Sequence, residues 1–241
     1  MESLSALGIE TQSLDITSDG SIEECVAKVK RLDILVNNSG ASYTMPIVDT
    51  PLLEAKKIFD VNVWGHLAVT QAFLPLLLKS SRPMIVNHTT TGVHISIPWQ
   101  AVYNASKAAM SRFSDTLRLE LQPSGVQVVE LKTGGVKTKI LSNLQARNPK
   151  LPAESIYMPA KDTVEEMLKV EWAEEHSSVS AEQWAEEVVA DILKKNPPPV
   201  IWRGESAWMA RLASVLPFGW LDGTFKQMTG LDKVEAIIRK Q

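Results

Sequence analysis

The chain has 241 residues, of which 44% are apolar and 22% charged, enough to bury one substantial core and to predict a single domain. Its net charge of -3 is spread along the sequence, so nucleic acid is not an expected partner. The lone cysteine, Cys25, cannot form an internal disulfide, no apolar run reaches the roughly 18 residues of a membrane span, and residues 1–10 lack a secretory signal, which together predict a cytoplasmic protein.

Short apolar runs alternate with longer helical segments along the whole chain. Their periods and flanking turn residues predict strands at 11–17, 32–40, 83–90 and 126–135, and helices at 21–29, 52–79, 101–121 and 180–195. Strands joined through helices need crossover connections, so the sequence predicts an α/β fold with a parallel sheet and helices on both faces.

Polar residues follow three of these strands, at 37–40, 89–92 and 133–135. Ligands of open parallel sheets bind beyond the carboxyl ends of the strands. We therefore expect the functional site at this edge of the sheet.

Tyr103 and Lys107 lie four residues apart and share one face of the predicted helix. A nearby ammonium group lowers the pKa of a phenol from about 10, which would let Tyr103 exchange a proton with a carbonyl or alcohol oxygen near neutral pH. Helices also carry such a pair by chance, so the pair alone does not assign chemistry.

Four segments together resemble the short-chain dehydrogenase/reductase family: "LDILVNNSG" (32–40), "FDVNVWG" (59–65), "YNASK" (103–107) and "TGGVKT" (133–138). The tail after residue 150 looks most like fungal 1-acyldihydroxyacetone-phosphate reductases, which reduce a lipid ketone with NADPH. The resemblance implies one Rossmann-like, doubly wound domain. Residues 1–140 would form its cofactor and catalytic part, and 141–241 a substrate lid and C-terminal extension.

The resemblance also implies four catalytic residues. Tyr103 would be the general acid, Lys107 would lower its pKa and bind ribose hydroxyls, and Asn62 would hold a helix distortion and a water. Thr90 occupies the position of the family's substrate-orienting serine. It keeps the hydroxyl, although its methyl group narrows the pocket.

Further residues receive cofactor or substrate roles from the same resemblance. NADP(H) is the implied cofactor, with NAD as the alternative, and its expected contacts besides Tyr103 and Lys107 are Asp15, Ile16, Asn38, Gly40, Gly134, Val136 and Thr138. The expected substrate pocket comprises Thr90, His94, Ile140, Leu141, Tyr157 and Met158. No metal site is expected, because neither His88 nor His94 has a carboxylate or cysteine at ligand spacing.

One departure from the family pattern is large. The Gly-rich turn that holds the dinucleotide pyrophosphate does not occur in the sequence, and Met1 corresponds to the helix before the family's third strand. We therefore expect the first βαβ unit to be lacking, which would uncover the edge of strand 32–40. Segment 11–17 could pair there, another chain could cover the edge, or the full gene product could be longer. A shortened gene model and a repurposed short form both stay open.

Two functional hypotheses follow. The first is an NADP(H)-dependent oxidoreductase that reduces a ketone, or oxidises a secondary alcohol, on an apolar or lipid-like substrate. The alternative is a cofactor-independent isomerase or cyclase, or a non-catalytic subunit that lost the phosphate site.

The remaining expectations concern surfaces. Trp64 and Phe73 would pack internally or between subunits of a homo-oligomer, and the acidic stretch 162–175 would be a solvated helix with Met167, Leu168 and Trp172 inward. The apolar tail 206–221 could lie on a membrane surface, cover the active site or bind a subunit. The lipid-handling resemblance adds the endoplasmic reticulum or lipid-droplet surface as a location.

Overall fold

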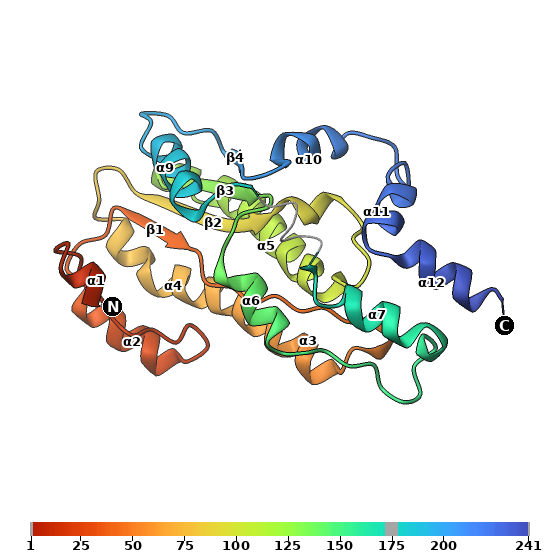
Figure 1. Cartoon of the computed structure of the whole chain (residues 1–241). Coiled ribbons are helices and arrows are strands. Elements are labelled where there is room, and N and C mark those ends of the chain that lie inside the picture. Colours follow the sequence, from red (N-terminus) through yellow and green to blue (C-terminus); the bar gives the residue numbers. More distant parts are fainter. Residues whose placement is uncertain (1, 172–177, 241) are drawn as a thin grey trace.

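A parallel four-stranded sheet with the order β1-β2-β3-β4 forms the centre of the molecule. The computed structural model describes residues 2–171 and 178–240, without the side chains of Glu2, Ser3 and Leu141 (Figure 1). The strands are β1 (Ile34–Asn37), β2 (Met84–Thr90), β3 (Gln127–Thr133) and β4 (Val200–Arg203). The parallel sheet confirms the predicted fold class.

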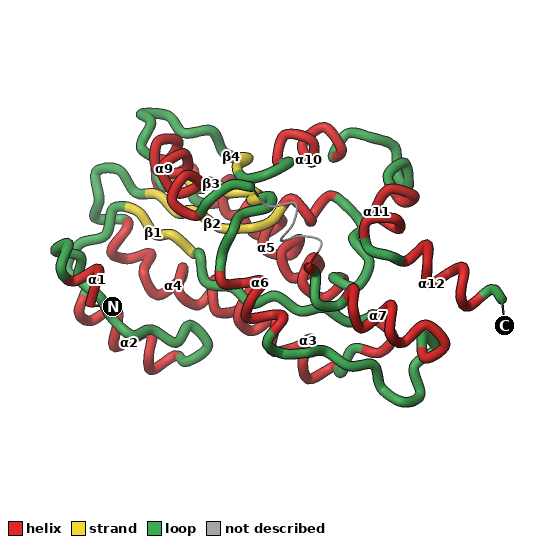
Figure 2. Tube along the Cα trace, viewed as in Figure 1, coloured by secondary structure: helices red, strands yellow, loops and turns green. Residues whose placement is uncertain are grey.

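Helices and helical turns make up most of the remaining described chain (Figure 2). The α-helices are α1 (Glu2–Ser5), α2 (Asp19–Lys28), α3 (Leu52–Phe59), α4 (Gly65–Leu77), α5 (Ala101–Glu120), α6 (Lys139–Gln145), α7 (Lys161–Met167), α9 (Ala181–Ile192), α10 (Ala207–Ala213), α11 (Asp222–Met228) and α12 (Leu231–Ile238). The short turns are η1 (Ile47–Asp49), η2 (Asp60–Trp64), η3 (Thr91–His94), η4 (Gln122–Ser124) and η5 (Met158–Ala160).

The sheet is covered on both faces because its strands are apolar on both sides. Met84 and Val86 of β2 pack toward α9, in a cluster that includes Val188 and Ile192 of that helix. Ile85, on the opposite face, belongs to the cluster that packs against α4 and α5. Figure 1 shows α9 and α4 on opposite sides of the sheet.

The strand register aligns the carboxyl ends of the strands. Asn37 pairs with Asn87 across β1 and β2, and Thr90 pairs with Thr133 across β2 and β3. Thr133 in turn lies opposite Arg203 of β4. The polar residues that follow the strands therefore meet at one edge of the sheet, as the sequence predicts.

A second core joins the two parts of the chain. It contains Tyr43, Ile58 and Trp99 from the first 140 residues, and Leu168 and Val234 from the remainder. The division at residue 140 stays a prediction.

The acidic stretch that begins at residue 162 has the expected inward residues. Leu168, which directly follows α7, is buried, and Met167, the last residue of α7, packs on the same core. Trp172 lies outside the described residues.

The predicted strand at 11–17 is wrong. Residues 11–15 have no regular secondary structure, residues 16 and 17 form a turn, and most side chains of the segment are exposed, because within the described residues no strand pairs with it. β1 consequently forms an edge of the sheet, and its Val36 side chain is 48% exposed.

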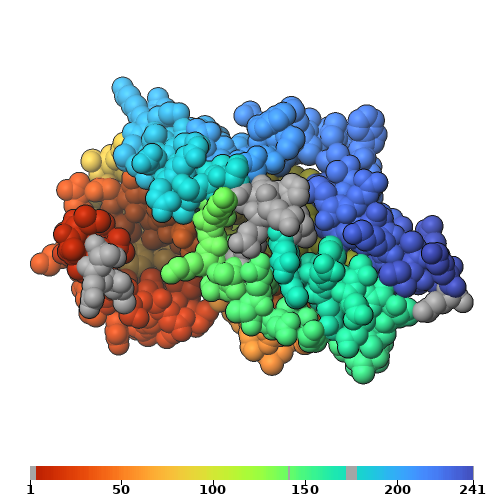
Figure 3. All heavy atoms as spheres, viewed as in Figure 1, coloured from red at the N-terminus to blue at the C-terminus, as the bar shows by residue number. Residues whose placement is uncertain are grey.

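The C-terminal segment after β4 leaves the sheet and runs along the side of the molecule opposite the N-terminus (Figures 1 and 3). The inner face of α10 is buried through Ala207 and Ala210. The large apolar side chains between residues 208 and 220 are exposed, with Phe218 98% exposed. Among the described helices, none is long and apolar enough to cross a bilayer.

Candidate active site

Asn62 lies in a local widening of the helix that precedes α4. Residues 60–64 form the π-helical turn η2, which is the helix distortion that the sequence predicts, and Asn62 is fully buried there. Its amide donates to the carbonyl of Ala41 and to Ser106 Oγ, both at 2.9 Å, and its Oδ1 accepts from the Ala41 amide at 2.9 Å. Ser106 Oγ donates to the Tyr103 carbonyl at 2.7 Å. Asn62 therefore ties the turn after β1 to the start of α5.

Tyr103 lies in the first turn of α5, close enough to the Thr90 side chain at the end of β2 for that hydroxyl to influence the pKa of its phenol. Burial raises the pKa of the phenol to about 12, and the contact with Thr90 only partly opposes this. The expected lowering of this pKa by Lys107 is wrong for this structure. The Lys107 ammonium instead donates to the His88 carbonyl at 2.9 Å.

Lys107 is itself enclosed, with 4% of its surface exposed, and burial lowers the pKa of its ammonium to about 8. A Cβ on Gly40 would lie 3.4 Å from Lys107 Nζ and 3.4 Å from Asn62 Oδ1. Gly40 thus lets the turn after β1 approach both polar groups closely. The structure brings Asn62, Thr90, Tyr103 and Lys107 together around the first two turns of α5.

Two histidines that the sequence analysis did not assign to the site hold its frame. His88 Nδ1 lies 2.7 Å from Asn38 Oδ1, and its Nε2 lies 2.7 Å from Thr133 Oγ1, so the ring joins the ends of β1 and β3. His66 Nε2 donates to the Ser39 carbonyl at 2.7 Å. Burial, with a smaller contribution from the Lys107 charge, lowers the pKa of His66 to about 4 and that of His88 to about 3. Both rings are therefore neutral at neutral pH.

A sequence signal for His88 did exist. It is the polar member of an inward-facing row whose other members, Met84 and Val86, are buried and apolar. A polar ring in such a row needs partners at the strand end, where Asn38 and Thr133 supply them.

The residues expected on the nicotinamide side of the cofactor pack against the end of β4. The Gly134 amide donates to the Arg203 carbonyl at 2.9 Å, and a Cβ on Gly134 would lie 2.1 Å from the Glu205 carbonyl oxygen. Val136 approaches Gly204, and Thr138 caps α6 by accepting from the Ile140 amide at 3.4 Å. This segment thus lies at the carboxyl edge of the sheet, and at Gly134 a side chain would leave no room for the neighbouring backbone.

Asp15 and Ile16 occupy the loop before α2. The Asp15 carboxylate accepts from the Thr17 hydroxyl at 2.7 Å and the Thr17 amide at 2.9 Å, and these bonds lower its pKa. Ile16 packs against the α2–α4 cluster, and its carbonyl lies 2.8 Å from where a Gly65 Cβ would be. Their described contacts join them to α2 and α4, and their adenine-binding role stays a prediction.

The expected substrate residues divide into two groups. Tyr157 packs edge-on against Trp99 with ring centroids 5.4 Å apart, and Met158 packs on the same core. His94, by contrast, is exposed and lies 2.6 Å from Lys132 Nζ. Ile140 is half-buried in α6, and nothing is described of the Leu141 side chain.

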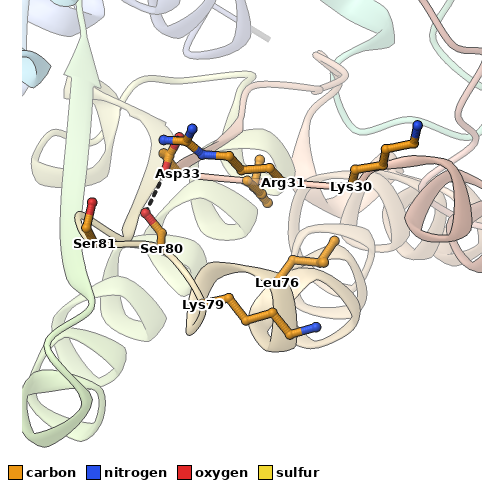
Figure 4. A pocket seen from close by; sticks show the side chains of 8 residues that line it. Lys30, Arg31, Asp33, Leu76, Lys79, Ser80 and Ser81 are labelled. Carbon is orange, nitrogen blue, oxygen red and sulfur yellow. Dashed lines mark hydrogen bonds and ion pairs between the residues drawn. The ribbon is translucent and has the colours of Figure 1, made fainter.

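Two cavities lie away from these residues. One, of about 250 Å³, opens at the amino end of the strands between Lys30, Arg31, Lys79 and Ser80, where Ser80 donates to Asp33 (Figure 4). The other, of about 240 Å³, lies between α4 and α5. Tyr103 lines neither of these two cavities. Within residues 2–171 and 178–240, no cluster of metal-ligating side chains occurs.

Comparison with known proteins gives consistent relatives. The family model described as short chain dehydrogenase matches residues 2–149. The short-chain dehydrogenase/reductase GME11361 of Pestalotiopsis microspora is 49% identical over 240 residues, which cover 99% of this chain and 84% of that protein. The NADPH-dependent 1-acyldihydroxyacetone phosphate reductase of Schizosaccharomyces pombe is 32% identical over 235 residues, covering 90% of this chain and 77% of that protein. A solved short-chain dehydrogenase from Streptomyces avermitilis shares the fold, with a TM-score of 0.71 at 22% identity over 98% of this chain and 83% of that one.

Proposed function

This chain belongs to the short-chain dehydrogenase/reductase family, and from that premise we propose that it reduces the ketone of an apolar, lipid-like substrate with NADP(H). The observation that carries the proposal is the hydrogen-bonded network at the start of α5, in which Ser106 joins Asn62 to the Tyr103 backbone and Lys107 donates to His88, two residues before Thr90. The S. pombe relative, whose name states NADPH dependence and an acylated ketone substrate, supports the choice of cofactor and substrate class.

The protonation state of Tyr103 favours the direction of reduction. With a pKa raised to about 12 by burial, the phenol keeps its proton at neutral pH. A protonated phenol can donate to a carbonyl oxygen that is becoming an alkoxide, while the Thr90 hydroxyl donates a second hydrogen bond to the same oxygen. Alcohol oxidation, the reverse step, would use the phenolate as the general base, and burial disfavours that charged form. We therefore assign the general acid to Tyr103 and the orienting hydroxyl to Thr90.

The residues beside Tyr103 fit the nicotinamide end of the cofactor, which supplies the hydride when bound. Among the described residues, the His88 carbonyl is the hydrogen-bond acceptor of Lys107 Nζ, so two of its three protons remain for ribose hydroxyls. The open space at Gly40 lies against that ammonium. The sequence carries no Gly-rich turn for the pyrophosphate, so the fit is limited to the nicotinamide and ribose end.

The apolar tail suggests how a lipid-like substrate would be reached. We assign the exposed side chains at 208–220 to contact with a lipid surface, because Arg211 is the one charged residue between 206 and 221. Tryptophan and phenylalanine side chains on such a surface insert among acyl chains near the headgroups.

The proposed function is tested by binding and turnover measured separately. NADPH and NADH are titrated against the intrinsic tryptophan fluorescence, and NADPH consumption is then followed with a long-chain acylated ketone and a short, polar ketone. We expect tighter binding of NADPH and preferential turnover of the long-chain ketone. Binding of neither nucleotide, with no turnover, would overturn the proposal.

A second candidate rests on Tyr103 and Lys107 themselves, as a phenol and an ammonium group on one helix face. Such a pair could move protons between substrate atoms without a dinucleotide, as an isomerase or cyclase does. Turnover of a ketone substrate without nicotinamide, abolished by Tyr103→Phe, would establish this candidate. Tight NADPH binding by this chain would count against it.

A further inference from the structure

A charged cluster is buried on the face of the sheet that packs against α5. Lys132 and Glu130 of β3 have side chains only 6% and 3% exposed, with Lys132 Nζ 3.4 Å from Glu130 Oε2. Glu130 Oε1 accepts from the Thr89 hydroxyl at 2.7 Å, and Lys132 Nζ lies 3.5 Å from Ser111 Oγ on α5. Burying two charges is costly unless their partners are fixed, so this cluster holds its neighbours in a defined geometry.

The cluster reaches the surface through His94. Lys132 Nζ lies 2.6 Å from His94 Nε2, so the ammonium donates and the imidazole accepts as a neutral ring. Trp202 of β4 completes the enclosure. Its ring stacks on His94 with centroids 5.6 Å apart, and Lys132 Nζ lies 5.3 Å from its centre.

His94 is the last residue of η3, and Thr90 caps the first turn of the same element. The Thr90 hydroxyl accepts from the Gly92 amide at 3.2 Å. η3 is thus held at one end by the side chain that contacts Tyr103 and at the other end by Lys132. The hydrogen bond from Thr89 to Glu130 also ties the residue before Thr90 to β3, the strand that carries Lys132.

We propose that Lys132, Glu130 and His94 are positioning residues that hold η3, and with it the Thr90 hydroxyl, in register with Tyr103, and that protonation of His94 releases this hold. We call these three residues the η3 brace. The effect of the brace on catalysis rests on the proposed function. Its effect on the position of η3 is independent of that function.

The acid sensitivity follows from the groups that face His94. A proton on Nε2 would point at the Lys132 ammonium, and burial together with that charge lowers the pKa of His94. Glu130 and Asp115 of α5 oppose the lowering. α10, which packs on η3, carries a single charged residue, the exposed Arg211, and Arg203 next to Trp202 is bound to Asp191 at 2.6 Å. The nearest charge to Nε2 is therefore positive, and it favours the neutral ring.

The brace is tested first without any activity measurement. Histidine resonances are titrated by NMR in the wild type, in Lys132→Met and in the control Lys28→Met, whose lysine is exposed on α2. We expect Lys132→Met to raise the pKa of His94 and to speed hydrogen exchange of the Gly92 amide, with the control unchanged. An unchanged His94 titration or an unchanged Gly92 exchange rate would overturn the brace, even if the chain has no reductase activity.

Substitutions at the exposed His94 keep the test valid if Lys132→Met does not fold. His94→Gln retains a non-titrating acceptor, whereas His94→Leu removes the acceptor. We expect His94→Leu to speed Gly92 exchange and to lower kcat about tenfold with KM within about twofold, as for a misplaced catalytic group. We expect His94→Gln, which keeps an acceptor for Lys132, to return Gly92 exchange to the wild-type rate and to lose the decline of activity at acid pH. Equal kcat in both variants and the wild type would show a purely structural cluster and contradict the positioning role.

Discussion

The Thr90 hydroxyl has three neighbours at once. It accepts from the Gly92 amide at 3.2 Å, donates to the Thr133 carbonyl at 3.4 Å and lies close enough to Tyr103 to oppose the rise in the pKa of that phenol. The Thr90 side chain therefore links the proton donor Tyr103, the turn η3 and the neighbouring strand β3. This explains why a threonine can replace the serine expected there, since each contact uses the oxygen and none uses the methyl group.

Thr90→Val tests this reading, because valine keeps the shape and removes the oxygen. We expect ketone reduction to fall about 10²–10³-fold, the loss typical of a missing oxyanion donor, and stability to fall by about 1 kcal/mol through the lost cap. Steady-state kinetics and urea unfolding measure the two effects. Thr90→Ser is the matched control and should stay within a few-fold of the wild type. A valine variant with wild-type turnover would exclude Thr90 from the reaction.

The buried neutral ring of His66 predicts a loss of stability in acid. The pKa of histidine is about 6.5 in an unfolded chain, and burial lowers that of His66 to about 4 in the folded protein. Between these values the unfolded chain binds a proton that the folded chain does not. The full stability is therefore present above pH 6.5 and is lost as pH falls toward 4, by up to about 3 kcal/mol for this residue.

Urea unfolding at intervals from pH 7.5 to pH 4 measures this loss. His66→Gln can still donate to the Ser39 carbonyl but does not titrate, so its stability should change less across the same range. His88, with its pKa lowered to about 3, adds a similar loss in both proteins. Parallel curves for the wild type and His66→Gln would contradict the neutral buried ring.

At the scale of elements, Gly134 allows the segment after β3 and the segment after β4 to approach each other closely. The Gly135 and Glu205 backbones pair, and a Cβ on Gly134 would lie 2.1 Å from the Glu205 carbonyl oxygen. Because that oxygen belongs to the backbone, the segments must separate to admit a side chain.

Gly134→Ala should therefore lower the free energy of unfolding by about 3 kcal/mol, at the upper end of the range for an overpacked position. Gly20→Ala is the matched control, because nothing lies within 4 Å of its added Cβ inside α2. That control should be neutral or stabilise the protein by about 0.5–1 kcal/mol. Chemical denaturation compares the two variants. An equal effect of both would mean that the close approach at Gly134 is not maintained in solution.

The elements with strong periodic patterns could be predicted from the sequence, and the tertiary contacts of single side chains could not. The helix at 101–121 and the strand at 83–90 are confirmed as α5 and β2 within a residue or two. Segment 11–17 alternates like a strand but has no neighbouring strand, and β-structure needs a partner that local sequence does not supply.

The site was predicted where motifs name residues and missed where contacts depend on the fold. Asn62, Thr90, Tyr103 and Lys107 come together as expected. The direction of the Tyr103 pKa was wrong, because helix spacing places Lys107 on the same face but does not fix where its flexible chain ends. His66 and the Lys132–His94 contact join residues 27 and 38 positions apart from their partners, beyond the reach of any local pattern.

At the scale of the whole molecule, the exposed tail predicts association with lipid. The wild-type chain should float with liposomes of mixed neutral and anionic lipid, and Phe218→Ser combined with Trp220→Ser should leave it in the unbound fraction. Ile47→Ser combined with Ile156→Ser removes comparably exposed apolar side chains elsewhere and is the control. If the tail variant instead converts an oligomer to a monomer without changing flotation, the tail binds a second copy.

The most direct test of the account is the rate of NADPH-dependent ketone reduction by Tyr103→Phe, measured beside Tyr43→Phe, a control at another tyrosine in the core. The account predicts a loss of at least about 10²-fold for Tyr103→Phe, the usual contribution of a positioned general acid, with NADPH binding retained and Tyr43→Phe near the wild type. Undiminished turnover by Tyr103→Phe would contradict the central claim that this phenol delivers the proton.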